Sequence, residues 1–180
     1  MPCPGDGTSL ASAALMSQLK VLVVYYSRSG NTRRIARAIA DAIPSEVEEI
    51  IDDRDRRGIV AYLRSGFEAW FARPVPLRES RHDPRQFDVV LIGTPIWNSS
   101  VSSPVRSWLT RHRDQLPEVA FFVTYGGSGI QRVVRQLQEL AARPPQAILA
   151  LRERDLAAAA PKVAAFAAEI RRTVAPRQAA

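Results

Sequence analysis

Short apolar runs without polar alternation recur along this chain. The central strands of a parallel sheet are buried on both faces, so they read as continuous apolar runs rather than as alternating ones. Four runs have this character: Val21 to Tyr26, Phe87 to Ile92, Val119 to Val123 and Ala147 to Leu151. A weaker run covers Val47 to Ile51, directly before a charged cluster. We expect these segments to be the strands of one sheet.

The segments between these runs have helical periodicity. Ile35, Ile39 and Ile43 form one apolar stripe, and a second lies within a basic, aromatic segment at residues 57–73. Ser103 is predicted to cap a third helix, with Pro104 in its first turn. The inward faces of the last two helices are predicted to be Val133, Val134, Leu137 and Leu140, and then Val163, Phe166, Ala167 and Ile170.

Alternating strands and helices predict right-handed crossovers and helices on both faces of the sheet. The fold class is therefore expected to be α/β, with a doubly wound, five-stranded parallel sheet. A length of 180 residues with 46% apolar residues suits one such domain, placed at residues 19–175. Residues 1–18 are expected to form a disordered or extended tail, and residues 176–180 a short C-terminal tail.

Charge and cysteine content narrow the function classes. The net charge of +7 comes from scattered arginines, with Lys20 and Lys162 the only lysines, so nucleic-acid binding is not expected. Cys3 is the only cysteine, which excludes an internal disulfide and a thiolate metal site. No metal site is predicted, and His82 and His112 are expected to be solvated. No signal peptide or membrane span is visible, so the expected location is cytoplasmic.

A loop rich in hydroxyl groups follows the first predicted strand and leads into the first helix. Its sequence is Ser27-Arg28-Ser29-Gly30-Asn31-Thr32. The unpaired N–H groups and positive dipole end of a helix start favour an anion here. Neither GxxxxGK[ST] nor GxGxxG is present, so a monophosphate fits better than a triphosphate or a dinucleotide. Arg33 and Arg34, in the first helical turn, either meet that negative charge or point into water.

At this loop the chain resembles a known family. The stretch from Val23 to Ile39 is similar to the signature of flavodoxin-like proteins, which include FMN-binding flavodoxins and NAD(P)H:quinone reductase-like proteins. The resemblance implies the strand order 2-1-3-4-5 and a bound FMN. Its phosphate would be held by Ser27, Ser29, Gly30, Asn31 and Thr32. Arg28 is placed among the cofactor-binding residues, although it departs from the uncharged loops usual in short flavodoxins.

Two further loops share this resemblance. The loop expected after the third strand is similar to one that contacts flavin, and Trp97 in it is either a flanking ring or a lid on the core. Three glycines at residues 126–129 let a backbone approach a flat ligand closely. The cofactor-binding residues predicted in these two loops are Thr94, Pro95, Ile96, Trp97, Asn98, Thr124, Tyr125, Gly126, Gly127 and Gly129.

The function implied by this resemblance is electron transfer through a bound flavin, with NAD(P)H as donor and a quinone-like acceptor. No side chain is predicted to be catalytic, because the flavin ring carries the chemistry. The partner would be a small-molecule acceptor or a redox protein. Two alternatives stay open: an electron carrier without its own substrate, and a cofactor-free interaction module. A low-molecular-weight phosphatase is excluded, since it needs Cys-x5-Arg in the first loop.

Overall fold

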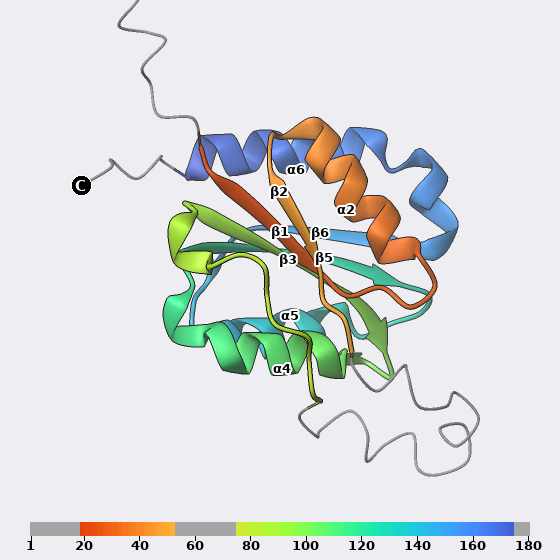
Figure 1. Ribbon diagram of the computed structural model, residues 1–180. Coiled ribbons are helices and arrows are strands. Elements are labelled where there is room, and N and C mark those ends of the chain that lie inside the picture. The colour runs from red at the N-terminus through yellow and green to blue at the C-terminus, as the bar shows by residue number, and fades with distance from the viewer. Residues whose placement is uncertain (1–18, 53–74, 175–180) are drawn as a thin grey trace, which may run out of the picture.

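The computed structural model describes residues 19–52 and 75–174 (Figure 1). The tails expected at residues 1–18 and 176–180, and the helix expected at residues 57–73, lie outside the described residues.

Five parallel strands form the central sheet, in the order β2-β1-β3-β5-β6. Their bounds are β1 Val21–Tyr25, β2 Glu46–Glu49, β3 Val89–Trp97, β5 Glu118–Tyr125 and β6 Pro145–Arg152. When only the parallel strands are numbered and β4 is left out, this order reads 2-1-3-4-5, so the expected fold is confirmed. In register, Val23 of β1 lies between Val47 of β2 and Leu91 of β3.

Helices cover both faces of the sheet, as Figure 1 shows. The helices α2 (Asn31–Ala42) and α6 (Ala160–Thr173) pack on one face, and α4 (Ser103–His112) and α5 (Ile130–Ala141) pack on the other. Short 3-10 helices lie at Pro84–Gln86, Arg113–Gln115 and Glu153–Ala158. Within the described ranges, no helix has the length and apolar character needed to cross a bilayer.

Each central strand contributes to two separate cores. In β1, Val21 and Val23 face α2 and α6, whereas Leu22 and Val24 face α4 and α5, and all four are buried. Full burial of such a side chain stabilises the fold by about 1.5–3 kcal/mol. The predicted inward face of α6 is confirmed, because Val163, Phe166, Ala167 and Ile170 are all buried.

The segment after the third strand differs from the expected loop. β3 continues to Trp97 and turns back at Asn98 and Ser99 into β4 (Ser100–Val101), which pairs with it antiparallel. Both turn residues have positive φ, 47° and 55°, which is the backbone of a two-residue type I′ hairpin. The expectation missed this hairpin because it lacks the glycine that usually marks such a turn.

The start of α4 also differs from the prediction. Ser102, not Ser103, is the N-cap residue, and its side chain does not cap the helix. Its hydroxyl lies 3.0 Å from Thr94 Oγ1 instead, and both residues are buried. This hydrogen bond joins the start of α4 to β3.

Gly93 lies where β3 passes the aromatic ring of Phe122 on β5. A Cβ atom at this position would lie 2.1 Å from Phe122 Cζ, and Phe122 is fully buried. The close approach of the ring therefore depends on the missing side chain.

We predict that Gly93→Ala lowers the free energy of unfolding by about 1–3 kcal/mol, the usual cost of overpacking a core. Urea unfolding of the protein without added ligand measures this. Gly127→Ala is the matched control, since no heavy atom lies within 4 Å of its would-be Cβ. Equal unfolding midpoints for the two variants would contradict the packing argument.

Candidate functional site

Three loops meet at the carboxyl edge of the sheet, where β1, β3 and β5 end (Figure 1). The strand order reverses direction between β1 and β3, the position where doubly wound sheets bind ligands. Thr32 Oγ1 and Thr124 Oγ1 share a buried hydrogen bond of 2.9 Å, which joins the first loop to the third. A Cβ atom on Gly129 would lie 2.6 Å from Ser99 Cβ, so the third loop also packs closely on the β3–β4 turn.

Gly30 shapes the first loop. It is the N-cap residue of α2 and has φ 89°, a left-handed conformation that favours glycine. No side chain caps this helix start, and no acidic residue lies in its first turn. The first N–H groups of α2 therefore have neither an intrahelical acceptor nor an acidic side chain of the first turn to offset the positive end of the helix dipole.

The hydroxyl group of Ser27 is buried in this loop without a partner. Ser27 is 9% exposed, and its Oγ has no hydrogen-bond partner among the described residues. Leaving a buried polar group unpaired costs about 1–3 kcal/mol. A ligand with acceptor oxygens, such as a phosphate, would satisfy this hydroxyl together with the start of α2. The residues present therefore fit a phosphate group.

Aromatic rings line the neighbouring part of the edge. Trp97, at the end of β3, is half-buried, and its ring meets that of Tyr26 edge to face, with 5.9 Å between centroids. The guanidinium carbon of Arg28 lies 5.7 Å from the centroid of Trp97. Tyr26 was not among the predicted site residues, although its place at the end of the first apolar run is a signal that could have included it.

Residues 19–154 match the family described as NADPH-dependent FMN reductase. The chain belongs to the NADPH-dependent FMN reductase family. The match spans all three loops of the candidate site.

Solved structures share the fold of this family member. A flavoprotein from Lactobacillus acidophilus NCFM in complex with FMN is 23% identical, with a TM-score of 0.57 over 80% of this chain and 97% of that one. The apo-form of the flavoprotein from the same organism is 26% identical, with a TM-score of 0.58 over 74% and 91%. The flavodoxin, WrbA-like protein from Agrobacterium tumefaciens is 17% identical, with a TM-score of 0.53 over 87% and 99%. No curated protein matches the chain significantly.

The other predicted site residues of this reductase-family chain differ in how accessible they are. Thr94, Pro95 and Thr124 are buried inside strands, and the Thr94 hydroxyl donates to the Pro95 carbonyl at 3.0 Å. The half-buried residues at the edge are Gly30, Asn31, Ile96, Tyr125 and Gly129. The exposed ones are Arg28, Ser29, Asn98, Gly126 and Gly127. The edge therefore presents half-buried and exposed groups above a buried layer of threonines.

Arg33 forms an ion pair, which the sequence did not reveal. Its Nη2 lies 2.7 Å from Glu49 Oε1 and its Nε donates to Glu49 Oε2 at 3.1 Å, so the contact is bidentate. The Tyr25 hydroxyl donates to the same carboxylate at 3.3 Å. Burial raises the pKa of Tyr25, and the charge of Glu49 raises it further. Arg33 thus binds β2, whereas Arg34 is exposed.

Both histidines contradict the expectation that they are solvated. His82 Nδ1 lies 2.8 Å from Glu48 Oε2, and Glu48 is buried. His112 is also buried and stacks on Trp108, with 4.5 Å between ring centroids. Burial lowers the pKa of His112, although the hydrogen bond to the Trp108 carbonyl acts in the opposite direction.

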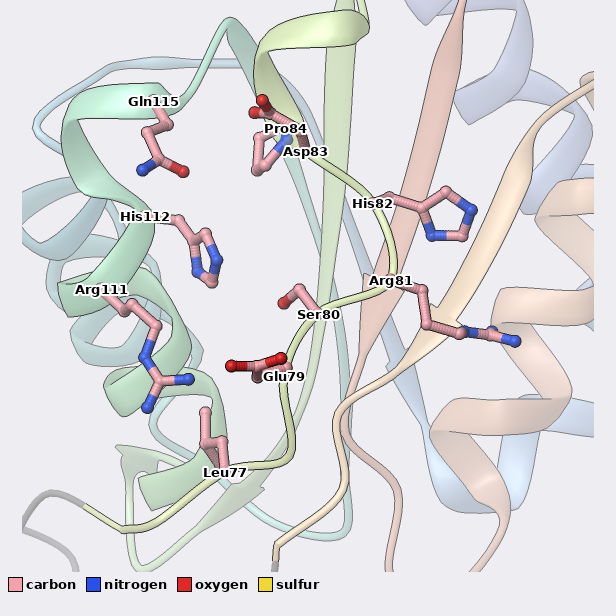
Figure 2. Close-up of a pocket in the computed structure, with 10 residues that line it drawn as sticks. All are labelled: Leu77, Glu79, Ser80, Arg81, His82, Asp83, Pro84, Arg111, His112 and Gln115. Carbon is pink, nitrogen blue, oxygen red and sulfur yellow. The ribbon is translucent and has the colours of Figure 1, made fainter.

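His112 and Ser80 point into a groove of 710 Å³ between residues 77–84 and the end of α4 (Figure 2). The structure describes all of the predicted cofactor-binding residues, and none of them lines this groove. It is therefore separate from the candidate site at the carboxyl edge.

The hydroxyl pair of Thr32 and Thr124 provides a test of how the loops are held. We predict that Thr124→Val costs about 1–3 kcal/mol, because it leaves the Thr32 hydroxyl buried without a partner. The double variant, Thr32→Val with Thr124→Val, should cost less than the sum of the two single changes. A double-mutant cycle from urea unfolding without ligand measures this coupling. Additive costs would show that the two hydroxyl groups do not interact.

Proposed function

We propose that this chain binds one FMN at the three loops and transfers electrons through it from NADPH to an acceptor. The observation that carries the proposal is the buried, unpaired hydroxyl of Ser27 beside the glycine-capped start of α2. Membership of the NADPH-dependent FMN reductase family supports the choice of cofactor and donor. The FMN complex of the Lactobacillus acidophilus flavoprotein, which has the same fold, supports the choice of cofactor.

The phosphate would lie at the start of α2. Ser27 and Ser29 would donate from their hydroxyl groups, and Gly30, Asn31 and Thr32 from main-chain N–H groups. Neutral donors at a helix start bind a phosphate without a lysine, because the helix dipole supplies part of the positive charge. The ion pair of Arg33 with Glu49 directs that guanidinium to β2, so it is not assigned to the phosphate.

The flavin ring would lie along the edge formed by the other two loops. Trp97 offers a half-buried aromatic surface there, and the exposed glycines at 126 and 127 let the main chain approach a flat ligand. Ile96, Asn98 and Tyr125 would border the ring, and Thr94, Pro95, Thr124 and Gly129 would shape the strand ends and the turn beneath it.

A bound flavin supplies hydride and electron transfer, and the protein supplies position and electrostatics. The side chains of the site act by holding and orienting the ligand, and none is required as an acid or a base. Arg28 adds a positive charge beside Trp97, at 5.7 Å from its ring centroid. Positive charge at this place favours anions, including the phosphate groups of NADPH. A quinone-like small molecule is the proposed acceptor.

We predict that Ser27→Ala weakens FMN binding about 10- to 150-fold, since a hydrogen bond to a charged group contributes about 1.5–3 kcal/mol. Fluorescence titration of flavin into the protein measures this. The stability of the ligand-free protein should not fall, because the change removes a hydroxyl that has no partner. That combination separates a binding role from a purely structural one.

Ser45→Ala is the matched control. Its Oγ is also buried without a described partner, but Ser45 precedes β2, at the opposite edge of the sheet. This variant should bind FMN as the wild type does. Riboflavin, which lacks the phosphate, should bind Ser27→Ala and the wild type equally. A loss of riboflavin affinity as large as that of FMN would overturn the assignment of Ser27 to the phosphate.

The donor requires a separate test. We predict that anaerobic mixing of the FMN-loaded protein with NADPH bleaches the visible flavin absorbance rapidly in a stopped-flow instrument, because the ring would be reachable by a nicotinamide. NADH under the same conditions reports the preference between the two donors. Absence of bleaching with either donor, in protein that a chemical reductant does bleach, would favour the electron carrier instead.

A further inference from the structure

Two polar side chains of the groove shown in Figure 2 are held in place by one residue of α4, Trp108. His112 Nδ1 donates to the Trp108 carbonyl at 2.9 Å, and the indole Nε1 of Trp108 donates to Ser80 Oγ, also at 2.9 Å. The rings of Trp108 and His112 are stacked, with 26° between their planes. Trp108 is itself buried, so both side chains are fixed to the core.

These contacts determine which atom of His112 faces a ligand. A carbonyl oxygen can only accept, so Nδ1 carries a proton. Burial lowers the pKa of His112, so the ring is neutral near pH 7 and Nε2 carries a lone pair. His112 is 8% exposed, and its Nε2 has no hydrogen-bond partner among the described residues. The ring points into the groove, so this acceptor is available there (Figure 2).

Ser80 supplies the opposite kind of group. An indole N–H can only donate, so Ser80 Oγ accepts from Trp108 and keeps its own proton. In the part of the chain that the structure describes, no group accepts that proton. The groove therefore offers one acceptor and one donor, and Trp108 orients both of them.

Two of the charged residues around the groove are already engaged. Both carboxylate oxygens of Asp83 accept from Arg85, at 2.8 Å and 3.0 Å. Arg81 donates to the Val47 carbonyl of β2 at 3.2 Å, and its side chain points away from His112 (Figure 2). Neither charge is therefore the main feature that a ligand of this groove would meet.

The remaining groups favour an uncharged ligand. Glu79 and Arg111 are both exposed and bring opposite charges to the groove. An anion has no proton to donate to His112 Nε2, and residues 19–52 and 75–174 hold no cluster of metal ligands. An amide group has an N–H donor and a C=O acceptor side by side. The groove volume of 710 Å³ lies within the range of small-molecule sites, about 300–1,000 Å³.

We propose that this groove binds a small, uncharged molecule through an amide group, which donates to His112 Nε2 and accepts from Ser80 Oγ. An exocyclic carboxamide and the ring amide of a pyrimidine base share this chemistry. Leu77 and Pro84, both buried, add apolar surface for the rest of the molecule. The inference does not depend on the proposed cofactor or activity, because the predicted cofactor-binding residues lie elsewhere.

We predict that benzamide, an exocyclic carboxamide, causes a saturable shift of the Trp108 indole N–H resonance in NMR spectra of the full chain. Trp108→Phe identifies that resonance among the indole signals. Uridine, added separately, tests the ring amide. Binding of either probe supports the proposal and identifies the kind of amide, whereas no saturable shift with either would overturn it.

Acetophenone tests the donor of the ligand. It has the shape of benzamide and keeps the carbonyl group, but a methyl group replaces the amide nitrogen. The wild type should bind it about 5-fold or more weakly than benzamide, because His112 Nε2 would be buried against a group that cannot donate. Equal affinity for the two compounds would overturn the assignment. This comparison uses the wild type alone, so it decides the question even if a variant fails to fold.

His112→Phe tests the acceptor. This variant keeps an aromatic ring to stack on Trp108 and removes Nε2, so it should lose the preference for benzamide over acetophenone. Arg81→Gln is the matched control, since it changes the same groove at a side chain that points away, and it should keep the preference. Circular dichroism verifies that both variants are folded. A preference unchanged in His112→Phe would refute the role of Nε2.

FMN titration of the same variants separates this groove from the site at the carboxyl edge. His112→Phe should bind FMN with the affinity of the wild type. Loss of benzamide binding with FMN binding intact therefore concerns the groove alone, and failure of FMN binding in the wild type would leave the benzamide result standing.

Discussion

Burial of the sheet on both faces is the constraint on which the rest of this structure depends. β1 and β3 have helices above and below them, so successive side chains of each strand belong alternately to one core and to the other. A strand in that position has no face for polar side chains, and polar groups are therefore confined to its ends. The five parallel strands end at one edge, so their polar ends gather there. The candidate site is a consequence of how the core is made.

Contacts between the loops complete that edge. The buried hydroxyl pair of Thr32 and Thr124 links two strand ends, and the packing of Ser99 against Gly129 links the β3–β4 turn to the third loop. Neither contact uses the Ser27 hydroxyl or the exposed start of α2. The protein thus supports the loops with one set of polar groups and leaves another set available to a ligand.

Several charged side chains act within the scaffold rather than at the site. Arg33 is held by Glu49, and His82 by Glu48, so two consecutive carboxylates of β2 serve different neighbours. Glu48 is buried, and a buried carboxylate needs partners, because removal from water is costly unless it is compensated. The excess of arginine in the chain is therefore partly structural, and net charge alone says little about what the protein binds.

The sequence by itself determined the α/β class, four of the strands closely, the inward face of α6 and the position of the hydroxyl-rich loop at residues 27–32 between β1 and α2. These follow from local patterns, since a strand buried on both faces and a hydroxyl-rich helix start are both visible in consecutive residues. The β3–β4 hairpin, the partners of Arg33 and both histidines, and the Thr32–Thr124 contact were decided only by the tertiary structure. Thr32 and Thr124 are 92 residues apart along the chain. Whether two polar groups so distant in sequence meet depends on strand order and register, and no local pattern carries that information.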